Sequence, residues 1–90
     1  MNKNDVSPPL SDLLESYCNV NAVSIHDLAN DLRTSIKPEI ADKFRQQLSD
    51  AIKYQTITPE QYESLTGEDF DTQEELSIWL QELWNDLFER

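Results

Sequence analysis

Apolar residues recur at helical spacing along almost the whole chain. The first such series, Leu10, Leu13, Leu14, Tyr17 and Cys18, follows the i, i+3, i+4, i+7, i+8 pattern of a helix with one buried face. No segment combines strict apolar and polar alternation with the β-branched enrichment of a half-buried strand. The pattern therefore predicts an all-α protein, a compact bundle of about five helices in a single domain.

Prolines and capping residues place the first two helices. The Ser-Pro-Pro sequence at residues 7–9 predicts a cap followed by first-turn prolines, in a helix that runs to about Cys18. Ser24, with Asp27 three residues later, predicts the cap of a second helix. The expected inner face of that helix is Ile25, Leu28, Ala29, Leu32 and Ile36.

Three further helices are predicted from Pro38 onward. The first of them begins at Pro38 and covers about residues 38–53. Its inward residues are expected to be Ile40, Ala41, Phe44, Leu48, Ala51 and Ile52. Residues 58–61 combine a threonine cap, a first-turn proline and a capping-box glutamine, and they open a short helix, anchored by Tyr62 and Leu65, that Gly67 ends. Thr72, with Glu75 three residues later, caps the longest helix, about 73–89. Its apolar stripe is Leu76, Trp79, Leu80, Leu83, Trp84, Leu87 and Phe88.

We expect residues 1–6 to be disordered and residues 7–90 to form the single helical domain. The N-terminus lacks the apolar core of a secretion signal, and no run approaches the roughly 18 apolar residues of a membrane span. Cys18 is the only cysteine, so no internal disulfide can form, and we expect it in the core. These features predict a cytoplasmic protein.

Negative charge is concentrated in the C-terminal third. Residues 57–90 hold ten carboxylates and one arginine, a net charge of −9, whereas residues 1–56 hold eight carboxylates and six basic residues, a net charge of −2. Such an asymmetry bears on partner choice and association rate rather than on fold. A total of −11 disfavours direct binding to nucleic acid or to a membrane, so the expected partner is a basic protein.

The candidate partner-binding residues lie between residues 60 and 86. Acids in a first helical turn also stabilise the helix through its dipole, so an acidic docking surface and a merely solvated acidic loop both remain open. Ile78 lies off the apolar stripe, as an apolar contact within an acidic interface or as an isolated exposed side chain. The predicted partner-binding set is Glu60, Glu63, Glu68, Asp69, Asp71, Glu74, Glu75, Ile78, Glu82 and Asp86.

The sequence predicts no catalytic residue, metal site or cofactor, and hence a protein that is not an enzyme. His26 has no second histidine to share a metal and is expected at the surface. Asp69, Asp71 and Gln73 match the first, third and fifth positions of a calcium loop. However, Glu74 stands where that loop needs glycine, and position twelve is not a glutamate.

Residues 57–67 (ITPEQYESLTG), 70–72 (FDT) and 75–84 (ELSIWLQELW) resemble the C-terminal part of small helical bacterial immunity proteins of the contact-dependent growth inhibition group. The resemblance covers about the last third of the chain and consists of size, acidity and the aromatic last helix. It implies a protein that binds a cognate toxin domain, typically a basic nuclease, and blocks its active site inside the producing cell. No toxin-contact residue of that group maps onto a position here, so the contact set depends on charge.

The alternative is a regulatory or antitoxin-like adaptor that binds a partner protein through an apolar helix face. The two readings differ in their response to salt, because screening weakens an acidic interface and leaves an apolar one largely intact. The sequence leaves open the identity of the partner, the site of inhibition, the oligomeric state and the exposed face of the last helix.

Overall fold

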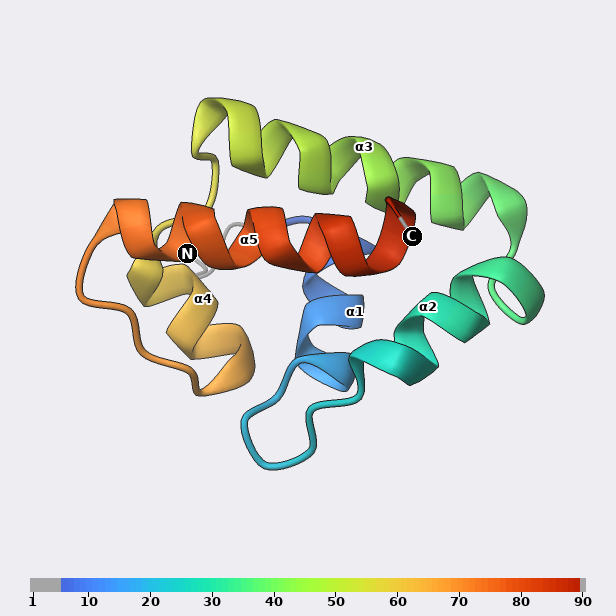
Figure 1. The fold of residues 1–90 in the computed structure, drawn as a ribbon, viewed down its shortest axis with the longest axis horizontal. Helices are drawn as coiled ribbons and strands as arrows, with labels where there is room; N and C mark the ends of the chain where they lie inside the picture. Colours follow the sequence, from blue (N-terminus) through green and yellow to red (C-terminus); the bar gives the residue numbers. More distant parts are fainter. Residues whose placement is uncertain (1–5, 90) are drawn as a thin grey trace.

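The computed structural model describes residues 6–89, which contain five α-helices and no strand (Figure 1). In chain order they are α1 (Leu10–Tyr17), α2 (Ile25–Thr34), α3 (Pro38–Tyr54), α4 (Pro59–Thr66) and α5 (Gln73–Phe88). The predicted all-α bundle is therefore confirmed. The disorder expected for residues 1–6 concerns mainly residues 1–5, which lie outside the described part, and Val6 packs half-buried against the core.

α5 is the central helix of the bundle. It crosses in front of α1 in Figure 1, packs against α2 and α3, and has α4 below its N-terminal half. Leu76, Leu80 and Leu83 on its inner face are fully buried. Burial of each leucine is worth about 1.5–3 kcal/mol relative to exposure, so this row is a major source of stability. The C-terminal end of α5 is held by Phe88, whose ring centroid lies 6.3 Å from that of Phe44 in α3.

The predicted inner faces of the helices are buried or half-buried with one exception. Ile40 was expected to face inward, but its side chain is 40% exposed. The reason is that no helix covers the first turn of α3, where a groove opens between α1 and the connection from α2 to α3. The hydrophobic spacing thus predicted the buried face of α3 correctly except at Ile40, in the first turn of the helix.

Two of the predicted helix caps are wrong. Ser24 occupies the N-cap position of α2, but its side chain accepts no capping hydrogen bond and its hydroxyl lies 3.4 Å from the carbonyl oxygen of Ala22. At α1 the N-cap residue is Pro9 rather than Ser7. By contrast, the capping box of Thr58 and Gln61 is present at α4, and Gly67 ends that helix with a left-handed φ of 82°. Glycine adopts this conformation without a Cβ penalty.

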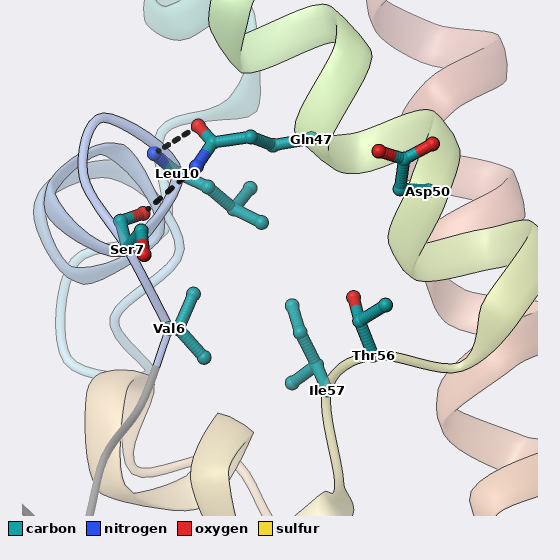
Figure 2. Close-up of a pocket in the computed structure, with 7 residues that line it drawn as sticks. All are labelled: Val6, Ser7, Leu10, Gln47, Asp50, Thr56 and Ile57. Carbon is teal, nitrogen blue, oxygen red and sulfur yellow. Dashed lines mark hydrogen bonds between the residues drawn. The ribbon is translucent and has the colours of Figure 1, made fainter.

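The start of α1 is stabilised instead by Gln47, a residue of α3 (Figure 2). Its Oε1 atom accepts a hydrogen bond of 3.1 Å from the backbone N–H of Leu10, and its Nε2 atom donates to the carbonyl oxygen of Ser7 at 3.2 Å. One side-chain amide therefore binds both the first residue of α1, Leu10, and the chain just before the helix, at Ser7. The first N–H groups of a helix need such a partner because they have none within the helix.

We predict that Gln47→Ala lowers the free energy of unfolding by about 1–2 kcal/mol, because it leaves the N–H of buried Leu10 without an acceptor. The control is Gln46→Ala on the same helix, which removes only an exposed 3.1 Å bond to Asp50. That change should cost a few tenths of a kcal/mol. Urea denaturation followed by circular dichroism measures both, and equal costs would contradict the capping role of Gln47.

Cys18 lies in the core, as predicted, and burial raises the pKa of its thiol to about 11. At about pH 8 the thiolate, which is the reactive form, is then a minor species in the folded protein. We predict that iodoacetamide labels Cys18 much more slowly in the native protein than in urea at the same pH. Mass spectrometry of timed samples measures both rates, and comparable rates would show that the thiol is accessible.

Candidate functional site

The exposed face of α5 carries negative charge and no positive charge. Glu74, Ile78 and Glu82 follow one another at four-residue spacing and so lie in one row on the helix. The exposed residues of this helix, which we call the acidic strip, are Glu74, Glu75, Ile78, Gln81, Glu82, Asn85 and Asp86. Glu74, Ile78, Glu82 and Asn85 lie opposite the buried leucines. Asp86 borders α2, where it lines a shallow hollow with His26, and Gln81 borders α3, where it lines another with Lys53. The helix therefore presents four carboxylates and one exposed isoleucine to solvent over a broad face.

The segment between α4 and α5 continues this negative surface. We call residues 67–72 the acidic loop; they run along the outer edge of the molecule in Figure 1, from the end of α4 to the start of α5. Asp69 and Asp71 are exposed, whereas Glu68 is half-buried. The loop therefore adds three carboxylates next to the N-terminal end of the acidic strip.

Hydrogen bonds fix the junction of the acidic loop with α5. The Thr72 hydroxyl accepts from the backbone N–H of Glu75 at 3.1 Å, which confirms the predicted N-cap. The Glu75 carboxylate in turn accepts from the N–H of Asp71 at 3.2 Å, one residue before the position expected of a capping box. Negative charge at a helix N-terminus also interacts favourably with the helix dipole. The first-turn acids therefore serve the helix and face solvent at the same time.

Aromatic contacts anchor the acidic loop to the core. The ring of Phe70 lies 5.7 Å from the ring of buried Tyr62, within the range of favourable aromatic pairs. The Tyr62 hydroxyl accepts a 2.6 Å hydrogen bond from the indole N–H of Trp79 on α5. Burial is the main cause that raises the pKa of Tyr62, so its hydroxyl stays protonated at physiological pH. The half-buried Trp79 is thus held in place by this hydrogen bond as well as by apolar packing.

The positive charges of the described residues lie on other segments of the chain, and one of them, Lys53 of α3, borders the strip in a hollow that it lines together with Gln81. Every lysine and arginine within residues 6–89 falls between residues 33 and 53, on α2, α3 and the connection between them. Arg45, on α3, places its guanidinium 5.4 Å from the ring centroid of Trp84 and 5.3 Å from that of Phe88. This cation–π contact holds the charge on the α3 side of α5. Within the described part of the chain, no lysine or arginine nitrogen lies within 4.0 Å of a carboxylate of the strip or loop.

The structure brings most of the predicted partner-binding residues together. Glu74, Ile78 and Glu82 share the outward face of α5, Glu75 and Asp86 are exposed at one side of it, and the acids of the loop adjoin its N-terminal end. Glu60 and Glu63 are exposed on α4, a separate helix, and neither forms a hydrogen bond or ion pair with a residue of the strip. The charge pattern did not identify Gln81 and Asn85. They lie three and seven residues after Ile78, and this helical spacing would have placed both on the same face as Ile78.

The remaining chemistry of the described residues is sparse. A pocket of about 200 Å³, shown in Figure 2, contains one carboxylate, Asp50, and no histidine, cysteine or lysine. This pocket is smaller than the roughly 300–1,000 Å³ of most ligand pockets, and a larger groove of about 700 Å³ between α1 and α3 also contains no histidine or cysteine. His26 is exposed, and no group of three or more metal-ligating side chains occurs within residues 6–89. No helix in that range has the length and apolar character that a membrane span requires.

Comparisons of the chain with protein-family models, with curated proteins and with solved structures found no match.

We predict that Thr72→Ala lowers the free energy of unfolding by about 1 kcal/mol, because it removes the hydroxyl that caps α5. The matched control is Ser24→Ala, at an N-cap position whose side chain makes no capping bond. We expect that change to cost less than about 0.5 kcal/mol. Thermal or urea denaturation measures both values, and a larger cost for Ser24→Ala would contradict the geometry of the two caps.

Proposed function

We propose that this protein is an immunity protein that binds a cognate basic toxin domain, of the nuclease class, and neutralises it. The observation that supports this most directly is the outward face of α5, which carries four carboxylates and no cation and continues into the acidic loop. A surface of one sign is electrostatically complementary to a basic protein surface. The resemblance of residues 57–84 to immunity proteins of the contact-dependent growth inhibition group points to the same class.

In the proposed mechanism the carboxylates occupy the positions that phosphates take on a nuclease. Charges of one sign speed the encounter by electrostatic steering, and they also reject partners that are themselves acidic. The carboxylates are carried by a helix that is packed along its whole inner face, so little backbone order is lost when they bind. The toxin's active site would then be covered in the cytoplasm of the producing cell.

Ile78 has a separate role in this proposal. It is 56% exposed and lies between Glu74 and Glu82 on the same row of the helix. Residues that dominate binding energy tend to sit near the centre of an interface, where surrounding contacts exclude water. Ile78 would supply an apolar contact at that centre, and the carboxylates around it would supply charge complementarity and association rate.

The test uses the proteins encoded by the reading frames adjacent to this gene in its source genome, purified as separate domains. We predict that one of them has a net positive charge and binds this chain. The double variant Glu74→Lys with Glu82→Lys, at the two carboxylates on either side of Ile78, should weaken that binding by at least about 100-fold at low salt, or roughly 2.7 kcal/mol. Calorimetry or biolayer interferometry measures the affinity, and a nuclease assay measures inhibition.

The matched control is Glu15→Lys with Asp42→Lys, which makes the same change in net charge at exposed positions on α1 and α3. It should leave the affinity within about threefold, because net charge alone acts mainly on the encounter rate. If both double variants bind like the original chain, the acidic face is not the interface. Binding that persists in about 1 M salt, where screening acts within about 3 Å, would favour an apolar adaptor instead.

A further inference from the structure

A second surface of different character lies on the part of the bundle that α4 and α5 do not line. It is a groove of about 700 Å³ between the start of α1, the connection from α2 to α3, and the first turns of α3. Its lining residues are Pro8, Pro9, Asp12, Leu13, Ser35, Ile36, Lys37, Glu39, Ile40 and Lys43. The groove therefore shares no residue with the acidic strip and acidic loop, to which we assign partner binding.

The floor and rim of this groove are mainly apolar. Leu13 and Ile36 are half-buried, and the prolines at positions 8 and 9 form one end. Ile40 lies at the groove with 40% of its side chain exposed, although its spacing along α3 is that of the buried Phe44 and Leu48. Covering apolar surface that the chain's own packing leaves open is favourable, so another molecule seated in the groove would gain free energy there.

The charges around the groove identify the molecule that fits it. Two lysines, Lys37 and Lys43, and two acids, Asp12 and Glu39, line it, so the groove is locally neutral in a chain of net charge −11. Within the described range, no nitrogen of these lysines lies within 4.0 Å of a carboxylate. All four charges thus remain available for a partner that carries the same numbers of both signs.

A second copy of the same chain has that complement. In a two-fold symmetric interface, residue i of one copy meets residue j of the other, and j meets i, so a patch that carries both lysines and acids can place the lysines of each copy opposite the acids of the other. The acidic strip and acidic loop would instead repel their own copies, because each carries charge of one sign. The groove carries charges of both signs, so two molecules of this strongly acidic protein can approach each other there without that repulsion.

We propose that this chain forms a two-fold symmetric dimer in which the grooves of two copies face each other, with Ile40 buried at the interface and the lysines of each copy opposite the acids of the other. The dimer leaves the acidic strip of both copies free, because no residue of α4 or α5 lines the groove. The proposal is therefore independent of the function assigned to the acidic strip.

The experiment compares two charge-reversed variants of the full chain by sedimentation velocity over a range of protein concentrations. One variant is Lys37→Glu with Lys43→Glu, and the other is Asp12→Lys with Glu39→Lys. The original chain should form a dimer as concentration rises, and each variant alone should dimerise at least tenfold more weakly, because like charges then meet across the two-fold axis. A mixture of the two variants should form a heterodimer, because its charges are complementary again.

Two controls separate this interface from other effects. Glu60→Lys with Glu63→Lys makes the same change in net charge on α4 as the second variant makes in the groove, and it should leave dimerisation intact. Ile40→Ser should weaken the dimer at least tenfold while circular dichroism shows the same helix content. An original chain that stays monomeric at the highest concentration would overturn the proposal. A mixture of the two reversed variants that stays monomeric, or an Ile40→Ser dimer of unchanged affinity, would also overturn it.

Discussion

The burial of one face of α5 determines what the rest of the molecule can present. Leu76, Leu80 and Leu83 are fully enclosed, and rotating the helix would expose this row. The loss would amount to several kcal/mol, comparable with the whole stability of a small domain. The rotation of α5 is thus fixed by its inner face. The carboxylates on the opposite face consequently stay in solvent, although they repel one another.

The two surfaces to which we assign binding differ in charge. The acidic strip and acidic loop carry carboxylates without cations, so they suit a positively charged protein and repel a second copy. The groove beside Ile40 is apolar and balanced in charge, so it suits a molecule like itself. Arg45 helps to keep the surfaces apart, because its guanidinium lies over the rings of Trp84 and Phe88 rather than among the carboxylates of α5.

Hydrophobic spacing, together with the capping motifs of α4 and α5, was sufficient to predict the fold because these signals are local. The five helices, the capping box at Thr58 and the left-handed Gly67 all follow from residues within one or two turns. The error at Ser24 is local, because its hydroxyl donates to the carbonyl oxygen of Ala22 instead of capping α2. The other errors come from tertiary contacts. Gln47 binds the start of α1 from 37 residues away, and Ile40 is exposed because no other helix reaches it. The acidic residues of the candidate site were evident from composition, but their common direction depends on the rotation of α5, and the placement of Glu60 and Glu63 depends on how α4 packs.

The hydrogen bond between Trp79 and Tyr62 links an intrinsic optical probe to the acidic loop. Tyr62 contacts Phe70 of that loop on one side and holds the indole N–H of Trp79 on the other. Tryptophan emission depends on the polarity and hydrogen bonding around the indole ring. Any molecule that displaces the loop will therefore alter the fluorescence of the unlabelled protein, so that its own spectrum records an encounter at this surface.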